Sequence, residues 1–418
     1  MIGKDKPGGP ALSRRTMLAG SAALPTALSL ASKGSAAPPA TGAGPPFAAL
    51  DGVYLDSGTM HPVPLAARAA VDAYHRTRMA GDHWPSHDVE VRVKQAFASL
   101  VGASPDELAF VQSTTAGEQL VIDALDIPAS GGRIVTDTLH FFGSFWLYEQ
   151  LAQRGMEVVW LKPVDGRIDP AQYEAAITED TRLVSLSLVS TYNGFEHDLA
   201  AITEIAHARG ARVYADIIHA AGTVPVDLHA SGVDFAASAS YKWLMGDFGL
   251  GFLYVRADRI EELRRSRFGY YQLARFQPHV YPFDAPGDTV ADMAPRDDAE
   301  GMFAMGTRSH AVMAQLDASL ALLLETGIDT IVERRLPLLE RLHEALPAKG
   351  YDVVTPRETR SALLTCALEG AYQQLNERLA DAKVSITLSR NRFRVCPSFF
   401  NTADDIERLL DVLPSQKG

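Results

Sequence analysis

The stretch ARVYADIIHAAGTVPVDLHASGVDFAASASYKWLMGDFGLGFLYV, residues 211–255, contains the segments that decide the fold. The segment RVYAD (212–216) has the composition of a buried strand and ends on an acid, Asp216. The segment ASASYK (237–242) predicts a second strand and places Lys242 at its terminus. Ligands of open parallel sheets bind outside the carboxyl ends of the strands. The two residues therefore form either a simple ion pair or parts of one ligand site.

Strand and helix patterns alternate ahead of this stretch and within it. Strand patterns cover residues 108–113, 132–137 and 156–162, and helix patterns cover residues 88–101, 117–125, 142–155 and 199–210. Such alternation predicts βαβ units with right-handed crossovers. We therefore expect an α/β fold, with a doubly wound and mostly parallel sheet in a large domain at residues 65–312. Long helices and two strand candidates then predict a smaller α+β domain at residues 313–418.

The composition is that of a soluble globular protein. The chain has 418 residues, of which 47% are hydrophobic, so it can bury a core large enough for two domains. Its formal net charge is -12, and no dense stripe of Lys and Arg is present, which argues against a nucleic-acid partner. The two cysteines, Cys366 and Cys396, have neither zinc-ligand spacing nor a disulfide framework. We expect both to be structural.

The N-terminus has the pattern of an export signal. Paired arginines, Arg14 and Arg15, precede a weakly apolar stretch that is too short and too mild to span a membrane. The small residues Ser-Ala-Ala follow at 35–37. This pattern resembles a twin-arginine signal, and the alternative is a disordered arm. We expect a signal peptide at residues 1–37, a linker and N-terminal arm at 38–64, and a periplasmic or extracellular protein.

A series of motifs in the opening stretch resembles the core of one enzyme family. In order, the motifs are D-x-x-H-x-x-G-x-x-P-V-D, Asp-Phe, S-Y-K-W and G-x-x-G-x-G-F-L-Y-V. Together they resemble the class V aminotransferase-fold enzymes, which include cysteine desulfurases, selenocysteine lyases, kynureninase and isopenicillin N epimerase. The similarity extends over about residues 50–413. It implies the aspartate aminotransferase-like architecture of fold type I and the cofactor pyridoxal 5′-phosphate.

The resemblance implies a role for five residues at the cofactor. Lys242 is the Schiff-base lysine, and Asp216 is the partner of the pyridinium nitrogen. His219 takes the place of a residue that hydrogen-bonds the phenolate oxygen of the ring. The turn VQSTTAGEQ places Thr114 and Thr115 at a helix start, where backbone N–H groups and the helix dipole favour a phosphate. An ordinary N-cap is the alternative for these threonines.

For two further cofactor contacts, two residues are candidates for the same position. His140 takes the place of the family's ring-stacking residue, and Phe141 is the alternative. The loop STYNG supplies a contact to the ring oxygen from Thr191 or from Asn193. The sequence leaves both candidates of the loop open.

The chain departs from the desulfurase pattern beside the lysine. Tyr241 stands where desulfurases often have His, and its hydroxyl is able to reach the phosphate instead. Ala239 stands where they often have Ser, with Ser238 and Ser240 on either side. We expect Ser240 and Tyr241 to lie at the phosphate.

Two more segments resemble parts of the family's active site. AMGTRSH contains Thr307 at the position that reaches the partner subunit's phosphate site, which implies a homodimer with shared active sites. FRVCPSFFNT resembles the closing motif, whose arginine binds the substrate carboxylate through a planar, two-pronged contact. This arginine is Arg394, with Arg390 and Arg392 as competitors and a charged strand face as the alternative.

The resemblance implies an enzyme that acts at the Cα of an α-amino acid through an external aldimine, with Lys242 as the base. The segment RFGYYQ and the C-terminal motif resemble the isopenicillin N epimerase branch most. Epimerisation needs a second acid or base, for which His61, Tyr270 and Tyr271 are candidates. The alternatives are a carbon–sulfur lyase that works by β-elimination, an aminotransferase, and an exported protein that binds its ligand without turnover. A cysteine desulfurase is disfavoured because neither cysteine lies in a mobile segment, and no metal is expected.

Overall fold

The computed structural model describes residues 46–417. The expected signal peptide and the linker as far as residue 45 lie outside the described residues. The expectation of export falls on those residues and stays a prediction.

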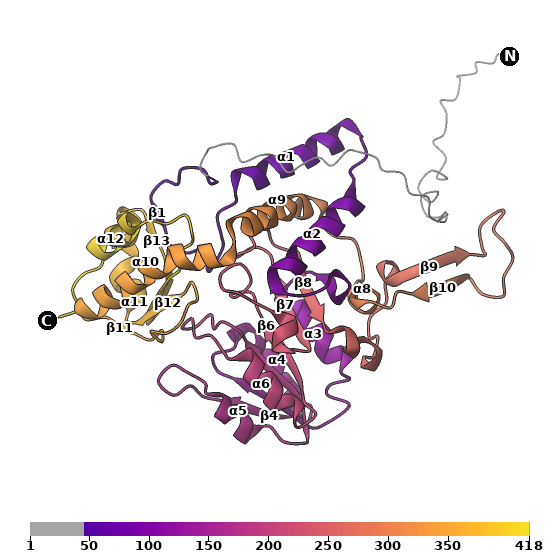
Figure 1. The fold of residues 1–418 in the computed structure, drawn as a ribbon, viewed down its shortest axis with the longest axis horizontal. Coiled ribbons are helices and arrows are strands. Elements are labelled where there is room, and N and C mark those ends of the chain that lie inside the picture. Colours follow the sequence, from indigo (N-terminus) through magenta and orange to yellow (C-terminus); the bar gives the residue numbers. More distant parts are fainter. Residues whose placement is uncertain (1–45, 418) are drawn as a thin grey trace, which may run out of the picture. The chain divides into compact units, whose positions relative to one another are not determined.

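A seven-stranded sheet forms the centre of the large domain (Figure 1). Its strands, in spatial order, are β2 (Leu108–Val111), β8 (Gly251–Val255), β7 (Phe235–Ala239), β6 (Arg212–Asp216), β5 (Thr181–Ser187), β3 (Arg133–Asp137) and β4 (Glu157–Leu161). Strand β8 runs antiparallel to both neighbours, and the other strands are parallel to one another. The predicted α/β fold with a mostly parallel sheet is confirmed.

Helices cover both faces of this sheet. Consecutive residues of a strand point to opposite faces, so a strand with apolar residues at successive positions packs against helices on both sides. In β6, Val213 belongs to one buried hydrophobic cluster and Tyr214 belongs to another. The first cluster includes residues of α2 (Ser86–Val101), α5 (Pro170–Ala176), α6 (Leu199–His207), α7 (Leu228–Ser231) and α9 (His310–Thr326). The second includes residues of α3 (Thr114–Ala124), α4 (Phe145–Gln153) and α8 (Ala299–Phe303). The sheet is therefore doubly wound, as predicted.

Short-range hydrogen bonds fix where the helices start and stop. The Ser113 hydroxyl accepts a hydrogen bond from the Ala116 N–H (3.1 Å) and caps α3. Helix α2 ends at Gly102, which has a left-handed φ of 63° that costs glycine no strain. Helix α1 (Leu65–Ala80) packs against α9. Helix α3 packs on the central strands β6, β7 and β8.

The C-terminal part has a buried cluster of its own. Helices α10 (Ile328–Ala348), α11 (Ala371–Asp381) and α12 (Ala403–Val412) contribute to this cluster. They accompany an antiparallel sheet with the order β11 (Asp352–Val353), β12 (Leu364–Ala367), β15 (Arg392–Val395) and β14 (Thr387–Ser389). Strand β1 (Val53–Tyr54) of the N-terminal arm pairs with β13 (Val384–Ser385). The buried residues of α9 belong to the cluster of the large sheet, and the domain boundary after residue 312 stays a prediction.

A hairpin that no sequence pattern indicated projects from the large domain (Figure 1). It consists of β9 (Leu273–Pro278) and β10 (Ala291–Pro295), which pair in antiparallel register.

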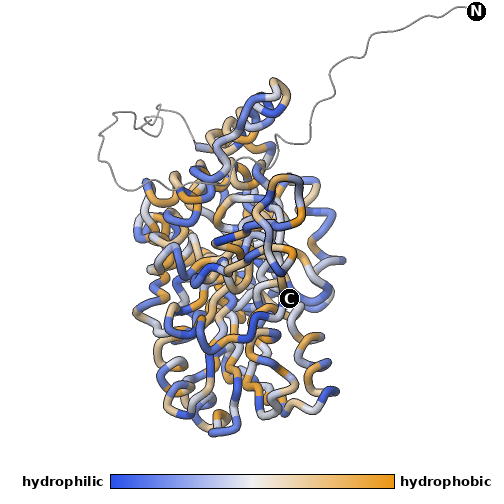
Figure 2. The backbone as a smooth tube through the Cα atoms, turned by 90° about the vertical axis from the view of Figure 1, so that its right-hand side faces the viewer, coloured by the Kyte–Doolittle hydropathy of each residue, from blue (hydrophilic) through white to orange (hydrophobic). Residues whose placement is uncertain are grey.

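Hydrophobic and hydrophilic residues are mixed along the backbone (Figure 2). Among residues 46–417, no single helix is both long and apolar enough to cross a bilayer. Helices α9 and α10 reach that length and composition only as a pair, which bends by 75° at the junction.

Candidate active site

The predicted acid and amine both lie near the carboxyl ends of the central strands. Asp216 is the last residue of β6 and pairs in register with Ser187, the last residue of β5. The prediction that Lys242 ends a strand is wrong, because β7 ends at Ala239. The chain then turns: the Ser240 hydroxyl donates to the Asp247 carbonyl (2.8 Å), and the Met245 N–H donates to the Lys242 carbonyl (2.9 Å). The turn carries Lys242 beyond the sheet edge, where ligands of such folds bind.

The Lys242 amine is buried and lies close to a histidine. Its Nζ is 2.9 Å from His219 Nε2. Burial lowers the pKa of Lys242 to about 8, and the positive charge of Arg394 acts in the same direction. No carboxylate lies within ion-pair distance of this amine in the described part of the chain. Lys242 therefore loses its proton at a lower pH than an ordinary lysine, which favours a role as a base or nucleophile.

Donor chemistry assigns the proton position of His219. The Trp243 indole N–H, which only donates, lies 3.2 Å from His219 Nδ1. Nδ1 is therefore the acceptor, and Nε2 carries the proton of the neutral ring. Burial, followed by the charges of Lys242 and Arg394, lowers the pKa of His219 well below its ordinary value. The Nε2–H faces Lys242 and the Thr191 hydroxyl, which is 3.1 Å away.

Asp216 is a buried acid without an ion-pair partner within residues 46–417. Its Oδ1 accepts one hydrogen bond, from the Ile218 N–H (2.9 Å). Burial raises the pKa of Asp216 to about 6, although the charge of His140 and the Ile218 hydrogen bond oppose the shift. An acid in this state binds a cationic or protonated nitrogen strongly, as its predicted role at a pyridine ring requires.

The start of α3 provides the anion donors. The first backbone N–H groups of a helix have no partner inside the helix, and Thr114 and Thr115 occupy these positions. The Thr114 Oγ1 accepts a hydrogen bond from the Ala239 N–H (3.0 Å). This contact joins the helix start to the end of β7, close to the turn that holds Lys242.

Arg394 is the arginine that enters the site. Its guanidinium donates to the Thr191 hydroxyl (2.8 Å), and to the hydroxyls of Thr59 and Thr387 (3.1 Å each). Its Nε is buried and has no hydrogen-bond partner among the described residues. Arg392 instead lies over the Tyr192 ring, at 4.8 Å from its centroid, and Arg390 is exposed. The unsatisfied N–H beside the bonded ones provides a donor for a substrate carboxylate.

The loop 190–194 separates its two candidates. The Asn193 side chain donates to the Gly166 carbonyl (2.7 Å) and accepts from the Phe195 N–H (3.1 Å). Thr191 contacts both His219 and Arg394. The geometry favours Thr191 as the ligand contact and gives Asn193 a role in shaping the loop.

The remaining phosphate candidates are arranged differently from one another. The Ser240 hydroxyl donates to the Asp247 carbonyl. The Tyr241 ring stacks on Phe248, with 4.4 Å between the ring centroids. Thr307 is exposed between α8 and α9, and no contact joins it to the other candidates within the described residues. Their roles at a phosphate stay predictions.

His140 is buried against β5 and α3. Its Nδ1 lies 2.9 Å from the Ser187 hydroxyl, and its Nε2 lies 3.0 Å from a carboxylate oxygen of Glu118. The alternative, Phe141, donates its backbone N–H to the same Ser187 hydroxyl (3.2 Å). Stacking of His140 on a ring stays a prediction.

The candidates for a second acid or base lie in different places. The His61 backbone N–H donates to the Tyr241 carbonyl (3.3 Å), and its ring bonds the Ser398 hydroxyl (2.7 Å). Burial lowers the pKa of His61 to about 4, so its ring is neutral near pH 7. Tyr271 lies under the Arg308 guanidinium, and Tyr270 is exposed.

Sequence reasoning missed several residues that contact the predicted ones. They include Glu118 and Ser187 at His140, Trp243 at His219, and Thr59 and Thr387 at Arg394. One signal was available, because Glu118 is an acid just ahead of the apolar run at residues 120–122. The other contacts join residues that are not neighbours in the chain and have no sequence signature.

The donor set fits pyridoxal 5′-phosphate. The cofactor needs an amine for its aldehyde, an acid for its ring nitrogen and N–H donors for its phosphate. Lys242, Asp216 and the start of α3 provide these groups at one edge of the sheet. Asp216 in particular lacks a cation that the ring nitrogen would provide.

Comparisons with known proteins agree with this chemistry. The family model for class V aminotransferases matches residues 53–390. A probable cysteine desulfurase of Methanothermobacter thermautotrophicus is 28% identical over 305 residues, which cover 70% of this chain and 72% of the relative. The isopenicillin N epimerase of Streptomyces clavuligerus is 26% identical over 387 residues, which cover 88% of this chain and 95% of the relative.

A solved structure shares the fold. It is a mutant of the protein C-DES with glycine covalently linked to its PLP cofactor. Its TM-score is 0.74 at 20% identity, and the match covers 86% of this chain and 96% of that one. The architecture of fold type I, predicted from the motifs, is confirmed.

Proposed function

The chain belongs to the class V aminotransferase family of pyridoxal 5′-phosphate-dependent enzymes, and on this premise we propose that it acts at the Cα of an α-amino acid. The reaction that we propose is epimerisation of the kind named for one relative, isopenicillin N epimerase. That relative matches 88% of this chain and is itself covered over 95% of its length.

One arrangement carries the proposal. The Lys242 amine contacts His219, His219 contacts Thr191, and Thr191 contacts Arg394 at 2.9, 3.1 and 2.8 Å. A nucleophilic amine and a carboxylate-binding guanidinium therefore face one small region of the site. Lys242 would hold the cofactor aldehyde to which the substrate amino group binds, and Arg394 would bind the substrate carboxylate.

Each residue then has a defined task. When bound, pyridoxal 5′-phosphate supplies an aldehyde for the substrate amine and a ring that withdraws electrons from Cα. Asp216 would hold the ring nitrogen, and His219 would donate its Nε2–H to the ring oxygen. Arg394 would bind the substrate carboxylate and orient Cα. Lys242 would take the Cα proton onto Nζ, which its lowered pKa permits near neutral pH.

Sulfur transfer is a weaker candidate for this chain. A desulfurase needs an accessible thiolate to take up sulfur. Cys366 and Cys396 are the chain's two cysteines, and both are free and buried. Burial raises the pKa of both thiols, which disfavours the thiolate. Carbon–sulfur elimination and transamination need no such thiol and are outcomes of the test below.

The first test is spectroscopic. The purified holoenzyme should show the visible absorption band of a lysine-bound cofactor, and Lys242→Ala should abolish this band. Lys94→Ala is the matched control, because Lys94 is a largely buried lysine paired with Glu300 (3.4 Å) away from the site. A protein that stays colourless after reconstitution with pyridoxal 5′-phosphate would contradict the proposal.

The second test identifies the reaction. The holoenzyme is incubated with a panel of L-amino acids in deuterium oxide. Exchange of the Cα proton with inversion supports epimerisation, whereas release of an α-keto acid and ammonia supports elimination. Conversion of the cofactor to its amine form supports transamination, and persulfide on a cysteine would overturn the argument against sulfur transfer.

We also propose that the protein is exported through the twin-arginine pathway and acts as a homodimer. The motif at Arg14–Arg15 and the family position of Thr307 support these two proposals. Cell fractionation of the wild type and of Arg14→Lys/Arg15→Lys tests export. Complementation between Lys242→Ala and Thr307→Ala chains tests shared sites, because a mixed dimer would regain one intact site.

A further inference from the structure

A buried carboxylate, that of Glu118, contacts the His140 ring. Glu118, on α3, is 2% exposed and accepts hydrogen bonds on both oxygens. The donors are His140 Nε2 (3.0 Å), the Tyr148 hydroxyl (2.5 Å), the Ser144 hydroxyl (2.5 Å) and the Ser185 hydroxyl (3.2 Å). A carboxyl group that only accepts is ionised. Glu118 is therefore a buried anion.

The charge of Glu118 has one counter-charge. Among residues 46–417, its only ion-pair partner is His140. The titratable groups that face His140 are Glu118 from α3, Asp137 from β3, Asp216 from β6 and the neutral Tyr148 from α4. Burial alone would lower the pKa of His140, but the hydrogen bond and the charge of Glu118, followed by those two aspartates, raise it. The contact with Glu118 and the raised pKa both favour the imidazolium form of His140.

Both ring nitrogens of His140 bond to protein groups, so its ring protons are not directed at a substrate. Nε2 is bonded to Glu118, and Nδ1 is bonded to the Ser187 hydroxyl. What His140 provides to its surroundings is a fixed ring plane and a positive charge. That charge opposes the effect of burial on Asp216 and favours its ionised form.

The charges in this part of the site alternate in sign: Glu118 and His140 are bonded directly, and the charges of His140 and Lys242 act on Asp216 through space. Glu118 is negative, His140 positive, Asp216 negative and Lys242 positive when protonated. Each charge lowers the cost of burying the next one. Removing the charge of Glu118 should therefore change the ionisation of Asp216.

We propose that Glu118 is a positioning residue of the cofactor site: it holds His140 as an imidazolium with both nitrogens bound to protein, and this cation keeps Asp216 ionised. The proposal rests on the proposed placement of Asp216 at the cofactor's ring nitrogen. It assigns His140 a role in charge and orientation, and no role as an acid toward the substrate.

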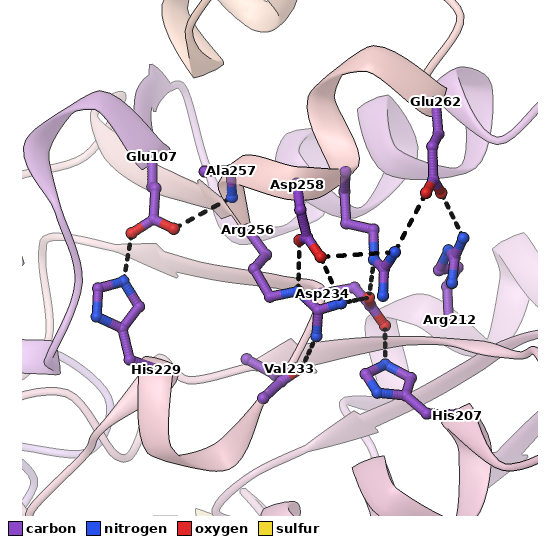
Figure 3. A network of polar contacts seen from close by, with 12 residues as sticks. Glu107, His207, Arg212, His229, Val233, Asp234, Arg256, Ala257, Asp258 and Glu262 are labelled. Atoms are coloured by element: carbon purple, nitrogen blue, oxygen red, sulfur yellow. Dashed lines mark hydrogen bonds and ion pairs between the residues drawn. The ribbon is translucent and has the colours of Figure 1, made fainter.

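The test compares two buried glutamates that each bind a histidine. Glu118→Gln keeps the side-chain shape and removes the charge. Glu107→Gln is the matched control, because Glu107 is 6% exposed and bonds His229 Nε2 (2.5 Å) and the Ala257 N–H (3.1 Å) (Figure 3). Glu107 lies ahead of β2 and makes no contact with the candidate site. A general loss of packing would affect both variants alike.

The first readout is NMR of isotope-labelled histidine in the full-length chain, without and with pyridoxal 5′-phosphate. In the wild type, both ring nitrogens of His140 should carry protons at pH 7 and above. In Glu118→Gln, His140 should lose one proton at a lower pH than in the wild type. A neutral His140 in the wild type at pH 7 would overturn the proposal, whether or not the variant folds.

The second readout is the cofactor itself. Glu118→Gln should weaken binding of pyridoxal 5′-phosphate by about tenfold, the effect of one lost charge contact. It should also move the pH profile of the bound cofactor's absorbance, whereas Glu107→Gln should leave both unchanged. Equal behaviour of the two variants would refute the positioning role. A wild type that binds no cofactor would instead refute the proposed function, while the NMR result on His140 still stands.

Discussion

Two buried aspartates at opposite ends of the same sheet differ in how their charges are compensated. Asp234 immediately precedes β7, and its carboxylate accepts from His207 Nε2 (2.8 Å) (Figure 3), from Arg259 Nε (2.7 Å) and from the Val213 N–H (2.8 Å). Asp216 ends the neighbouring strand β6 and accepts from one backbone N–H alone. Protein groups therefore compensate the charge of Asp234, whereas most of the hydrogen-bonding capacity of Asp216 is available to a ligand.

The difference shows that burial of the Asp216 charge lowers the stability of the fold at the position proposed for the cofactor. A buried ion is tolerated when cations and N–H donors surround it, and Asp234 meets this condition. Asp216 does not, and its raised pKa records the cost. Strain of this kind is concentrated at functional sites.

Asp216→Asn should have the largest effect on activity and the opposite effect on stability. We expect kcat/KM to fall by about 10³-fold, equal to about 4 kcal/mol, because the ring nitrogen loses its acid. The cofactor-free protein should gain at most about 3 kcal/mol in its free energy of unfolding at pH 7. Steady-state kinetics and urea denaturation measure the two effects.

The pH dependence of the stability gain follows from the direction of the shift. Because the pKa of Asp216 is raised from 3.8 to about 6 in the fold, its contribution to stability is present below pH 3.8 and lost as pH rises through about 6. The advantage of Asp216→Asn should therefore be largest above pH 6 and should vanish near pH 4. A variant that is less stable than the wild type at pH 7 would break the comparison.

Asp234→Asn should show the reverse balance. Removing this charge takes away the buried partner of Arg259 and Arg256 and leaves them the more exposed Asp258, with Glu262 also at Arg259. We expect a loss of about 3 kcal/mol in the free energy of unfolding. The kcat/KM of the protein that remains folded should be unchanged. A loss of activity without a loss of stability would mean that the Asp234 end of the sheet also serves the reaction.

Much of this comparison was accessible from sequence. Short apolar runs such as RVYAD predicted buried strands, and the acid at the end of that run predicted a ligand position, because strand direction fixes which end carries the site. Motif spacing then related Asp216, His219 and Lys242 to one cofactor. These features are local, so local patterns are enough to find them.

The remainder depends on contacts between distant parts of the chain. The turn that carries Lys242 past β7 exists because β8 returns antiparallel and pairs Ala239 with Gly251. The proton position on His219 depends on Trp243, and the charge of His140 depends on Glu118. No periodicity encodes which nitrogen a distant side chain bonds.

Trp243→Phe should have a smaller effect, confined to the site. The variant keeps an aromatic ring near His61 but removes the N–H that assigns the His219 proton to Nε2. We expect kcat to fall by about tenfold, or about 1.4 kcal/mol, with little change in KM. Kinetics across pH measure this effect, and a change in KM alone would argue that Trp243 shapes the substrate pocket instead.

Glu262→Gln should have the smallest effect. It tests an exposed acid at the edge of the ion pairs around Asp234, whereas Asp234→Asn tests the buried acid at their centre. Glu262 pairs with Arg212 and with Arg259 (3.2 Å), but its side chain is 46% exposed, so water screens its charge (Figure 3). We expect a loss of about 0.5 kcal/mol in the free energy of unfolding, and less at high salt. Urea denaturation at low and high ionic strength measures it. A loss as large as that of Asp234→Asn would mean that the whole network acts as one unit, and that burial of the single acid does not explain the difference between the two ends of the sheet.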